Sequence, residues 1–280
     1  MTTTTAPNRV IRGGTRQALS DGLVVMWRNL KRIPRIPELA IFAVIQSIMF
    51  VLLFAFVFGG AIPLPGYEGV PNAYREYLMP GIFVQTLAFS SATTAIGMTD
   101  DMAKGIIDRF RSLPMARSAV LTGRSFSDAI YQTGILCVLM VSGLLVGWSV
   151  NNGAVDFLIG VALLVAFAFT MSWVGIWLGL SVPTVEVGQQ VTFVVIFPIT
   201  FISSAFVPIQ TMPTWLQPFA EWNPVSTLTT SLRILWGNPN PFATDNLPSQ
   251  QPILVTIGWI IVIVGVFAPL GIRKYRQTSR

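Results

Sequence analysis

The amino-acid sequence predicts an all-α integral membrane protein with six transmembrane helices. Three observations support this fold class: an apolar composition, six apolar runs long enough to cross a bilayer, and an uneven distribution of Lys and Arg. Hydrophobic residues make up 52% of the 280 positions and charged residues only 11%, with a mean hydropathy of +0.65. Soluble domains carry about one quarter charged residues, so this composition excludes an ordinary soluble protein.

A transmembrane helix needs about 20 mostly apolar residues. The predicted spans cover residues 39–60, 78–98, 128–148, 155–180, 187–207 and 253–271. Because six is an even number, both termini lie on the same side of the membrane. The predicted organisation is a disordered arm (1–14), an interfacial helix (15–37), a six-span domain (38–272) and a basic tail (273–280).

The distribution of Lys and Arg predicts that both termini are cytoplasmic. Of the 18 basic residues, 16 lie in the N-terminal arm, the second-to-third connection and the tail. Basic residues are retained on the cytoplasmic side, and the two exceptions, Arg75 and Arg233, fall in connections that the six-span count places outside. The basic residues flank apolar runs, so anionic lipid headgroups explain them and nucleic acid does not. We expect a multi-pass plasma-membrane protein.

The segment before the first span has the pattern of an amphipathic helix. At 100° per residue, Leu23, Trp27 and Leu30 share one face, whereas Asp21 and Arg28 lie opposite. Such a helix is suited to the plane of the membrane interface, although a disordered basic arm is the alternative. The chain has no histidine and a single cysteine within an apolar run, which disfavours metal binding and disulfide pairing.

The connection between the second and third spans has the pattern of a short surface helix over residues 100–114. Met102 and Phe110 share an apolar face, and Lys104, Asp108 and Arg111 share a charged one at spacings that allow ion pairs. This helix either docks a partner or is a solvated helix resting on lipid. The residues alone leave both interpretations open.

Within the connection over residues 208–252, the stretch 214–219 is apolar and aromatic but too short and too closely flanked by proline to span. It predicts a re-entrant or interfacial hairpin, in which Trp215 and Trp222 serve either as interfacial anchors or in gating. A short helix over 224–235 should follow and end near Gly237. Glycine pairs at small-xxx-small spacing, at 143 and 147 and at 175 and 179, are interpreted as sites of close helix packing.

The middle of every predicted span lacks charged residues, which disfavours proton or sodium coupling and a charged ion-selectivity filter. The sequence also lacks a G-x-x-x-x-G-K-[ST] phosphate loop. Energy for uphill transport must therefore come from another polypeptide. A cytoplasmic helix between spans would be suited to transmit it.

Residues 101–114, 195–207, 211–217 and 223–225 resemble permeases of type 2 ABC exporters, in particular the daunorubicin/doxorubicin-resistance group of actinobacteria. The resemblance covers residues 27–271. It implies a second permease, identical or related, and two cytoplasmic ATPase subunits that bind ATP and Mg, with no cofactor or metal bound by this chain. It also implies export of a hydrophobic or amphipathic drug, lipid or polyketide.

The same resemblance implies roles for individual residues. The helix between the second and third spans would contact the ATPase through Lys104, Gly105, Asp108, Arg109, Phe110, Arg111, Leu113 and Pro114. Secondary contacts would come from Arg28, Lys31, Arg32 and Glu186. An extracellular lid would include Trp215, Leu216 and Trp222.

The second and fifth spans would line the transport path, for which the candidates are Phe83, Gln85, Phe89, Phe193, Phe197 and Phe201. Lipid contact or core packing explains these side chains equally well. Two other functions remain: a membrane-embedded lipid-modifying enzyme or assembly factor, which would have to use scattered acids such as Glu76, Glu221 and Asp245, and a passive scaffold or channel that needs no ATPase.

Overall fold

The computed structural model describes residues 15–31, 37–57, 64–67, 70, 72–107, 117–242 and 244–277, and this part of the chain is helical with no sheet. The α-helices are α1 (Thr15–Leu30), α2 (Pro37–Leu52), α3 (Ala73–Ala103), α5 (Arg117–Val146), α6 (Ala154–Ser181), α7 (Val185–Phe201), α8 (Gln217–Trp222), α9 (Pro224–Trp236), α10 (Leu247–Gln250) and α11 (Pro252–Gln277). A π-helical stretch, Leu53–Val57, continues α2, and a short 3₁₀ turn, Ile209–Thr211, follows α7.

Four helices, α3, α5, α6 and α11, are long and apolar enough to cross a membrane, and α7 is a shorter apolar helix. The all-helical membrane prediction is therefore confirmed. The predicted first span is occupied by α2 and its π-helical continuation, and the count of six crossings stays a prediction. The predicted disordered arm, 1–14, lies outside the described residues, and α11 continues to Gln277 through most of the predicted tail.

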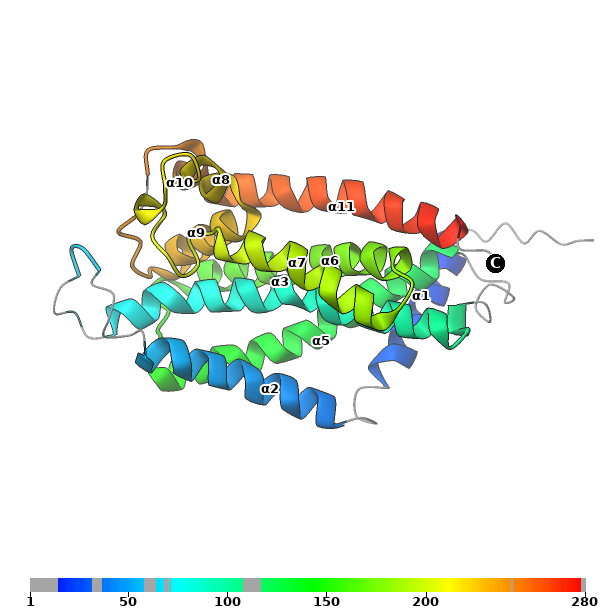
Figure 1. Ribbon diagram of the computed structural model, residues 1–280. Helices are drawn as coiled ribbons and strands as arrows, with labels where there is room; N and C mark the ends of the chain where they lie inside the picture. The colour runs from blue at the N-terminus through cyan, green and yellow to red at the C-terminus, as the bar shows by residue number, and fades with distance from the viewer. Residues whose placement is uncertain are drawn as a thin grey trace, which may run out of the picture.

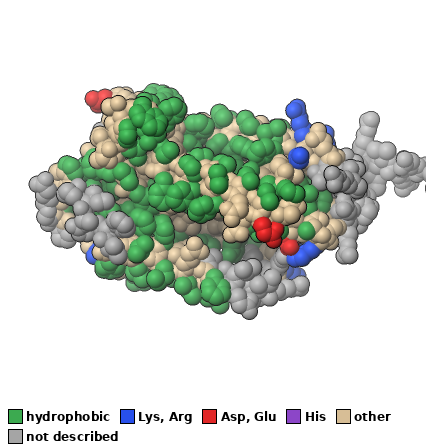
Figure 2. All heavy atoms as spheres, in the orientation of Figure 1, with side chains coloured by type: hydrophobic (Ala, Val, Ile, Leu, Met, Phe, Trp, Pro, Cys, Tyr) green, Lys and Arg blue, Asp and Glu red, His purple; other side chains and the backbone are tan. Residues whose placement is uncertain are grey.

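The long helices run side by side, with short helices gathered at one end (Figure 1). Helices α8, α9 and α10 lie at the end called here the α8 end, and α1 lies at the opposite end, the α1 end, together with the C-terminal end of α11. Figure 2 shows a largely hydrophobic surface between the two ends, whereas the charged side chains gather at the ends. This distribution fits a bundle whose middle lies in hydrocarbon.

Helix α3 is the centre of the bundle and packs against α6, α7 and α9. Its buried Phe83 makes edge-to-face contacts with Trp148 and Trp236, at centroid distances of 5.2 and 5.9 Å. Glycines allow α6 to approach closely, because a Cβ at Gly175 or Gly179 would overlap the backbone carbonyls of α3. The packing interpretation of this glycine pair is confirmed.

The predicted fifth span, 187–207, is wrong at its C-terminal end, because α7 stops at Phe201. The Asn223 side-chain amide donates hydrogen bonds to the carbonyls of Ile199, at 2.6 Å, and Ile202, at 2.7 Å. These bonds replace the backbone donors that a longer helix would supply, so the chain turns back at this point. The same side chain accepts from the backbone N–H of Val225 and begins α9.

Helix α9 confirms the short helix predicted before Gly237. It ends at Trp236, and Gly237 has the left-handed backbone (φ 65°) that commonly terminates helices. Its residues are almost all buried, so it lies inside the bundle at the α8 end and not on the surface.

Substitution of Gly179 by Val is expected to destabilise the bundle, because the new side chain would be forced against α3. Overpacking of this kind costs about 1–3 kcal/mol. Gly265→Val on α11 is the matched control, since a Cβ added there would meet no neighbouring atom within 4 Å. Thermal unfolding of purified protein in detergent measures the difference, and equal midpoints for the two variants would contradict this packing.

Candidate functional site

At the α1 end, the connection between α3 and α5 begins with a tight turn. Lys104 pairs with Asp100 at 2.7 Å, and Gly105 adopts a left-handed backbone with φ of 65°. The predicted surface helix does not begin at residue 100, because Asp100 and Asp101 continue α3 to Ala103. The predicted coupling residues Asp108, Arg109, Phe110, Arg111, Leu113 and Pro114 lie outside the described residues.

Three charged side chains form an ion cluster that joins α3 to α5. Arg124 Nη1 lies 2.6 Å from Asp101 Oδ2, and Arg124 Nε lies 3.2 Å from Asp128 Oδ2. The Thr94 hydroxyl donates to the same Asp128 oxygen at 2.9 Å. The Arg124 side chain is 13% exposed and that of Asp101 is 8% exposed, so the cluster is well shielded from solvent.

The ion cluster joins the two helices on either side of the connection, since Asp101 lies near the end of α3 and Arg124 lies in the first part of α5. Gly97 provides the space for the guanidinium, because a Cβ there would overlap Arg124. The sequence prediction placed Asp101 on a surface helix and Asp128 at a span end, and it did not join them. The i, i+4 spacing of Arg124 and Asp128 was the available signal.

Helix α1 packs against α5 near this connection. The Gly22 carbonyl approaches Gly123 closely, Val25 is buried, and Asn29 donates to the Ser127 hydroxyl at 3.4 Å. The predicted apolar face is turned outwards, with Leu23 and Trp27 about 60% exposed. An outward apolar face suits contact with the membrane interface.

The remaining predicted contact residues border the same end. Arg28 and Lys31 are exposed, and the Lys31 amino group lies 5.3 Å from the centre of the Trp27 ring. Arg32 lies outside the described residues. Glu186 is exposed in the first turn of α7, where hydrogen bonds from its own backbone N–H and the Thr184 hydroxyl lower the pKa of its carboxyl.

The candidate path residues separate into two groups. Phe193, Phe197 and Phe201 form a phenylalanine row on α7, with ring centroids 5.2 and 4.2 Å apart and each ring at least 40% exposed. Phe89 of α3 joins the row, 5.9 Å from Phe193. The structure does not bring Phe83 to this row, because that ring is fully buried against Trp148 and Trp236.

Gln85, the polar candidate for the path, is also buried, with 4% of its surface exposed. Its side-chain oxygen has no hydrogen-bond partner among the described residues. It lies one helical turn before Phe89 on the same face of α3, but its burial places it in the core and not in the exposed row.

At the α8 end, Arg233, which the sequence places in the connection between the fifth and sixth predicted spans, is buried within the bundle. Its side chain is 1% exposed and donates to the carbonyls of Tyr77, at 2.9 Å, and Ser204, at 3.0 Å. The guanidinium carbon lies 3.7 Å from the centre of the Tyr77 ring. Because α9 folds back into the bundle, Arg233 reaches the carbonyl of Tyr77 on α3 and that of Ser204 in the turn after α7.

The predicted lid residues lie at the same end. Trp215 is 70% exposed and Trp222 is 49% exposed, whereas Leu216 is partly buried. The Trp222 carbonyl accepts a hydrogen bond from the Trp259 indole at 2.8 Å, which fastens α8 to α11.

Comparison of the sequence with known proteins identifies its family. The profile of the ABC-2 type transporter family matches residues 22–236. The chain belongs to this family. It is 30% identical to the daunorubicin resistance ABC transporter permease protein DrrB1 of Streptomyces coeruleorubidus, over 94% of this chain and 88% of the relative.

Two further relatives of this permease match over most of their length. The probable doxorubicin resistance ABC transporter permease protein DrrC of Mycobacterium tuberculosis is 24% identical, over 98% of this chain and 95% of the relative. The putative transport permease ycf38 of Cyanophora paradoxa is 23% identical, over 92% and 89%. The resemblance inferred from the sequence and the predicted membrane location are confirmed.

The chain is thus the membrane permease of an ABC-2 exporter, and an ABC permease works with an ATPase subunit. Two of the three acids considered for a lipid-modifying enzyme have structural partners: Glu76 accepts from Ser149, and Glu221 accepts from Asn246. Within the described part of the chain, no group of three or more His, Cys, Asp or Glu residues could hold a metal ion.

Replacement of Arg233 by Met should destabilise the permease, because carbonyls of α3 and of the turn after α7 would lose their donor. Unsatisfied buried polar groups cost about 1–3 kcal/mol each, so a loss of about 3 kcal/mol or more is expected. Arg276→Met, at an exposed position of α11, is the control and should be neutral. Thermal unfolding with an assay of membrane-inserted yield distinguishes them, and a neutral Arg233→Met would refute the structural role of this arginine.

Proposed function

We propose that this permease exports a hydrophobic or amphipathic compound and that its α1 end faces the cytoplasm, where the ATPase binds. The observation that carries this proposal is the ion cluster, which joins α3 to α5 beside the connection between them. This connection lies at the α1 end of the bundle. Lys104, Arg28 and Lys31 lie at this end, as expected of a cytoplasmic surface. Six crossings would then be formed by α2, α3, α5, α6, α7 and α11.

The ion cluster provides a route by which a push on the connection would move two helices together. Asp101 belongs to α3 and Arg124 to α5, so a displacement of one is transmitted to the other through a short, shielded ion pair. The proposed ATPase contacts are Lys104 and Gly105 together with the residues at 108–111, 113 and 114. Arg28, Lys31, Arg32 and Glu186 would border the contact.

We further propose that the phenylalanine row and Phe89 face a second permease, identical or related, across the transport path. The row is exposed and apolar in the single chain, and a partner facing it would convert it into the wall of an internal passage. The relatives' names refer to daunorubicin and doxorubicin resistance, which supports an aromatic, amphipathic cargo. Stacking between rings would recognise such a cargo without demanding a fixed hydrogen-bond pattern.

Trp215, Leu216 and Trp222 would form the extracellular lid over this passage. They lie at the α8 end, opposite the proposed ATPase contact, and two of the three are largely exposed. Their indole rings suit the headgroup region, where one part of the ring contacts hydrocarbon and the other water.

Asp101→Asn should uncouple the ATPase from transport, because Arg124 would lose the charge that links α5 to α3. We expect cargo-stimulated ATP hydrolysis and efflux to fall roughly tenfold, as for the loss of more than 1 kcal/mol of coupling. The control is Asp100→Asn, which removes the charge of the exposed pair with Lys104 and should change both rates less than about twofold. Equal rates for the two variants, measured in proteoliposomes containing the ATPase, would exclude this role.

Phe197→Ala should weaken cargo recognition, because it removes the central ring of the phenylalanine row. A loss of about 1 kcal/mol or more would raise the cargo concentration for half-maximal ATPase stimulation roughly fivefold. Val262→Ala, at a position 54% exposed on α11 and outside the row, is the matched control. If both variants shift the concentration equally, the row does not contact cargo.

A further inference from the structure

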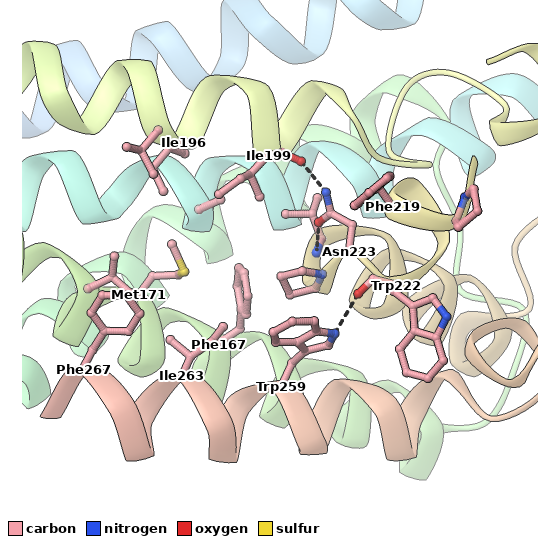
Figure 3. A pocket seen from close by; sticks show the side chains of 16 residues that line it. Phe167, Met171, Ile196, Ile199, Phe219, Trp222, Asn223, Trp259, Ile263 and Phe267 are labelled. Carbon is pink, nitrogen blue, oxygen red and sulfur yellow. Dashed lines mark hydrogen bonds between the residues drawn. The ribbon is translucent and has the colours of Figure 1, made fainter. Parts of the chain in front are cut away.

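An apolar pocket of about 670 Å³ lies between α7 and α11 (Figure 3). Helices α3 and α6 contribute the inner wall, and α8 and the beginning of α9 close one end. Its volume is within the range of roughly 300–1,000 Å³ that is usual for ligand pockets. The lining includes Phe167, Met171, Ile199, Phe219, Trp259 and Ile263.

The pocket is elongated along the helix axes. Trp259, Ile263 and Phe267 line it from successive turns of α11 and together extend about 12 Å along that helix, at 1.5 Å per residue. Val195 and Ile199 line the facing wall on α7. A segment of an extended hydrocarbon chain fits along this length.

The polar groups around the pocket are already hydrogen-bonded to the protein. Asn223 uses its amide nitrogen on two backbone carbonyls and its oxygen on the N–H of Val225. The Trp259 indole donates to the Trp222 carbonyl, as Figure 3 also shows. A polar or charged ligand would therefore lose its hydrogen bonds to water without replacement, which selects an apolar occupant.

Helix α11, beside the pocket, presents apolar side chains outwards. Leu254, Ile261 and Val262 are all more than half exposed, as expected of a surface that contacts lipid. The hydrocarbon of the bilayer is therefore the phase that adjoins the pocket. An apolar space left empty forfeits dispersion contacts on its lining, so a chain from that phase is favoured to enter.

We propose that this pocket binds one acyl chain of a membrane phospholipid, at a site separate from the cargo path. On a helix with 100° per residue, the lining residues Val195 and Ile199 lie on the side of α7 opposite to Phe193 and Phe197. The phospholipid would thus sit behind the helix that carries the phenylalanine row. This site goes beyond the proposed export function and does not depend on the identity of the cargo.

The test is native mass spectrometry of the full-length permease, reconstituted with palmitoyl-oleoyl phosphatidylglycerol and then extracted into mild detergent. We expect a single tightly retained phospholipid per chain. Ile263→Trp, which fills the pocket, should reduce the retained fraction roughly fivefold or more. Val262→Trp, at the neighbouring outward position, should leave it unchanged, and thermal unfolding checks that both variants are folded.

The opposite wall supplies a second pair of variants should Ile263→Trp fail to fold: Ile199→Trp in the pocket and Val194→Trp outside it. Absence of a retained phospholipid in the parent protein, or equal retention in pocket and control variants, would overturn the proposal. Daunorubicin that displaces the phospholipid one for one would instead identify the pocket as a cargo site. A pocket variant that abolishes self-association of the permease but leaves phospholipid retention unchanged would identify the pocket as an interface between copies of the chain. Either of these two results would also overturn the proposal.

Discussion

Polar groups that enter this apolar bundle need partners inside the protein, because hydrocarbon offers none. Two buried arginines satisfy this constraint at opposite ends. Arg233 donates to carbonyls of α3 and of the turn after α7, which allows the chain to leave helical geometry there and fold α9 back. Arg124 lies between two carboxylates and joins α3 to α5 beside the connection between them. The position of the α8 end and the anchoring of the proposed ATPase contact both depend on these bonds.

The α1 end and the α8 end would have different functions in the permease. At the α1 end, shielded ion pairs would make α3 and α5 respond together to the ATPase. In the middle, α7 presents the phenylalanine row on one side and the apolar pocket on the other, so its movement would affect both. At the α8 end, α7 is tied through Asn223 to α9, which connects the row to the proposed lid.

Properties that depend on local pattern were predictable from the sequence. The apolar runs predicted the long helices. The segment from Asn223-Pro224 to Gly237 predicted α9, and the glycine pair at 175 and 179 predicted the close approach of helices that α6 and α3 make. Properties that depend on distant partners were not predictable. The burial of Arg233 was not predictable because the carbonyls that its side chain satisfies lie 29 to 156 positions away. Likewise, Asp101 looked exposed because Arg124 is 23 positions distant, and α7 looked longer because its end is set by Asn223.

The most direct test of the central claim, that the α3–α5 connection at the α1 end is the cytoplasmic contact of the ATPase, is site-specific cross-linking in the assembled transporter. Lys104→Cys and Trp215→Cys would be introduced in a Cys137→Ser background, each treated with a short bifunctional reagent in the presence of the ATPase. The account predicts a permease–ATPase product from position 104, with a yield that changes on ATP binding, and none from position 215. A product from position 215, or none from position 104 in a transporter that is assembled and active, would contradict it.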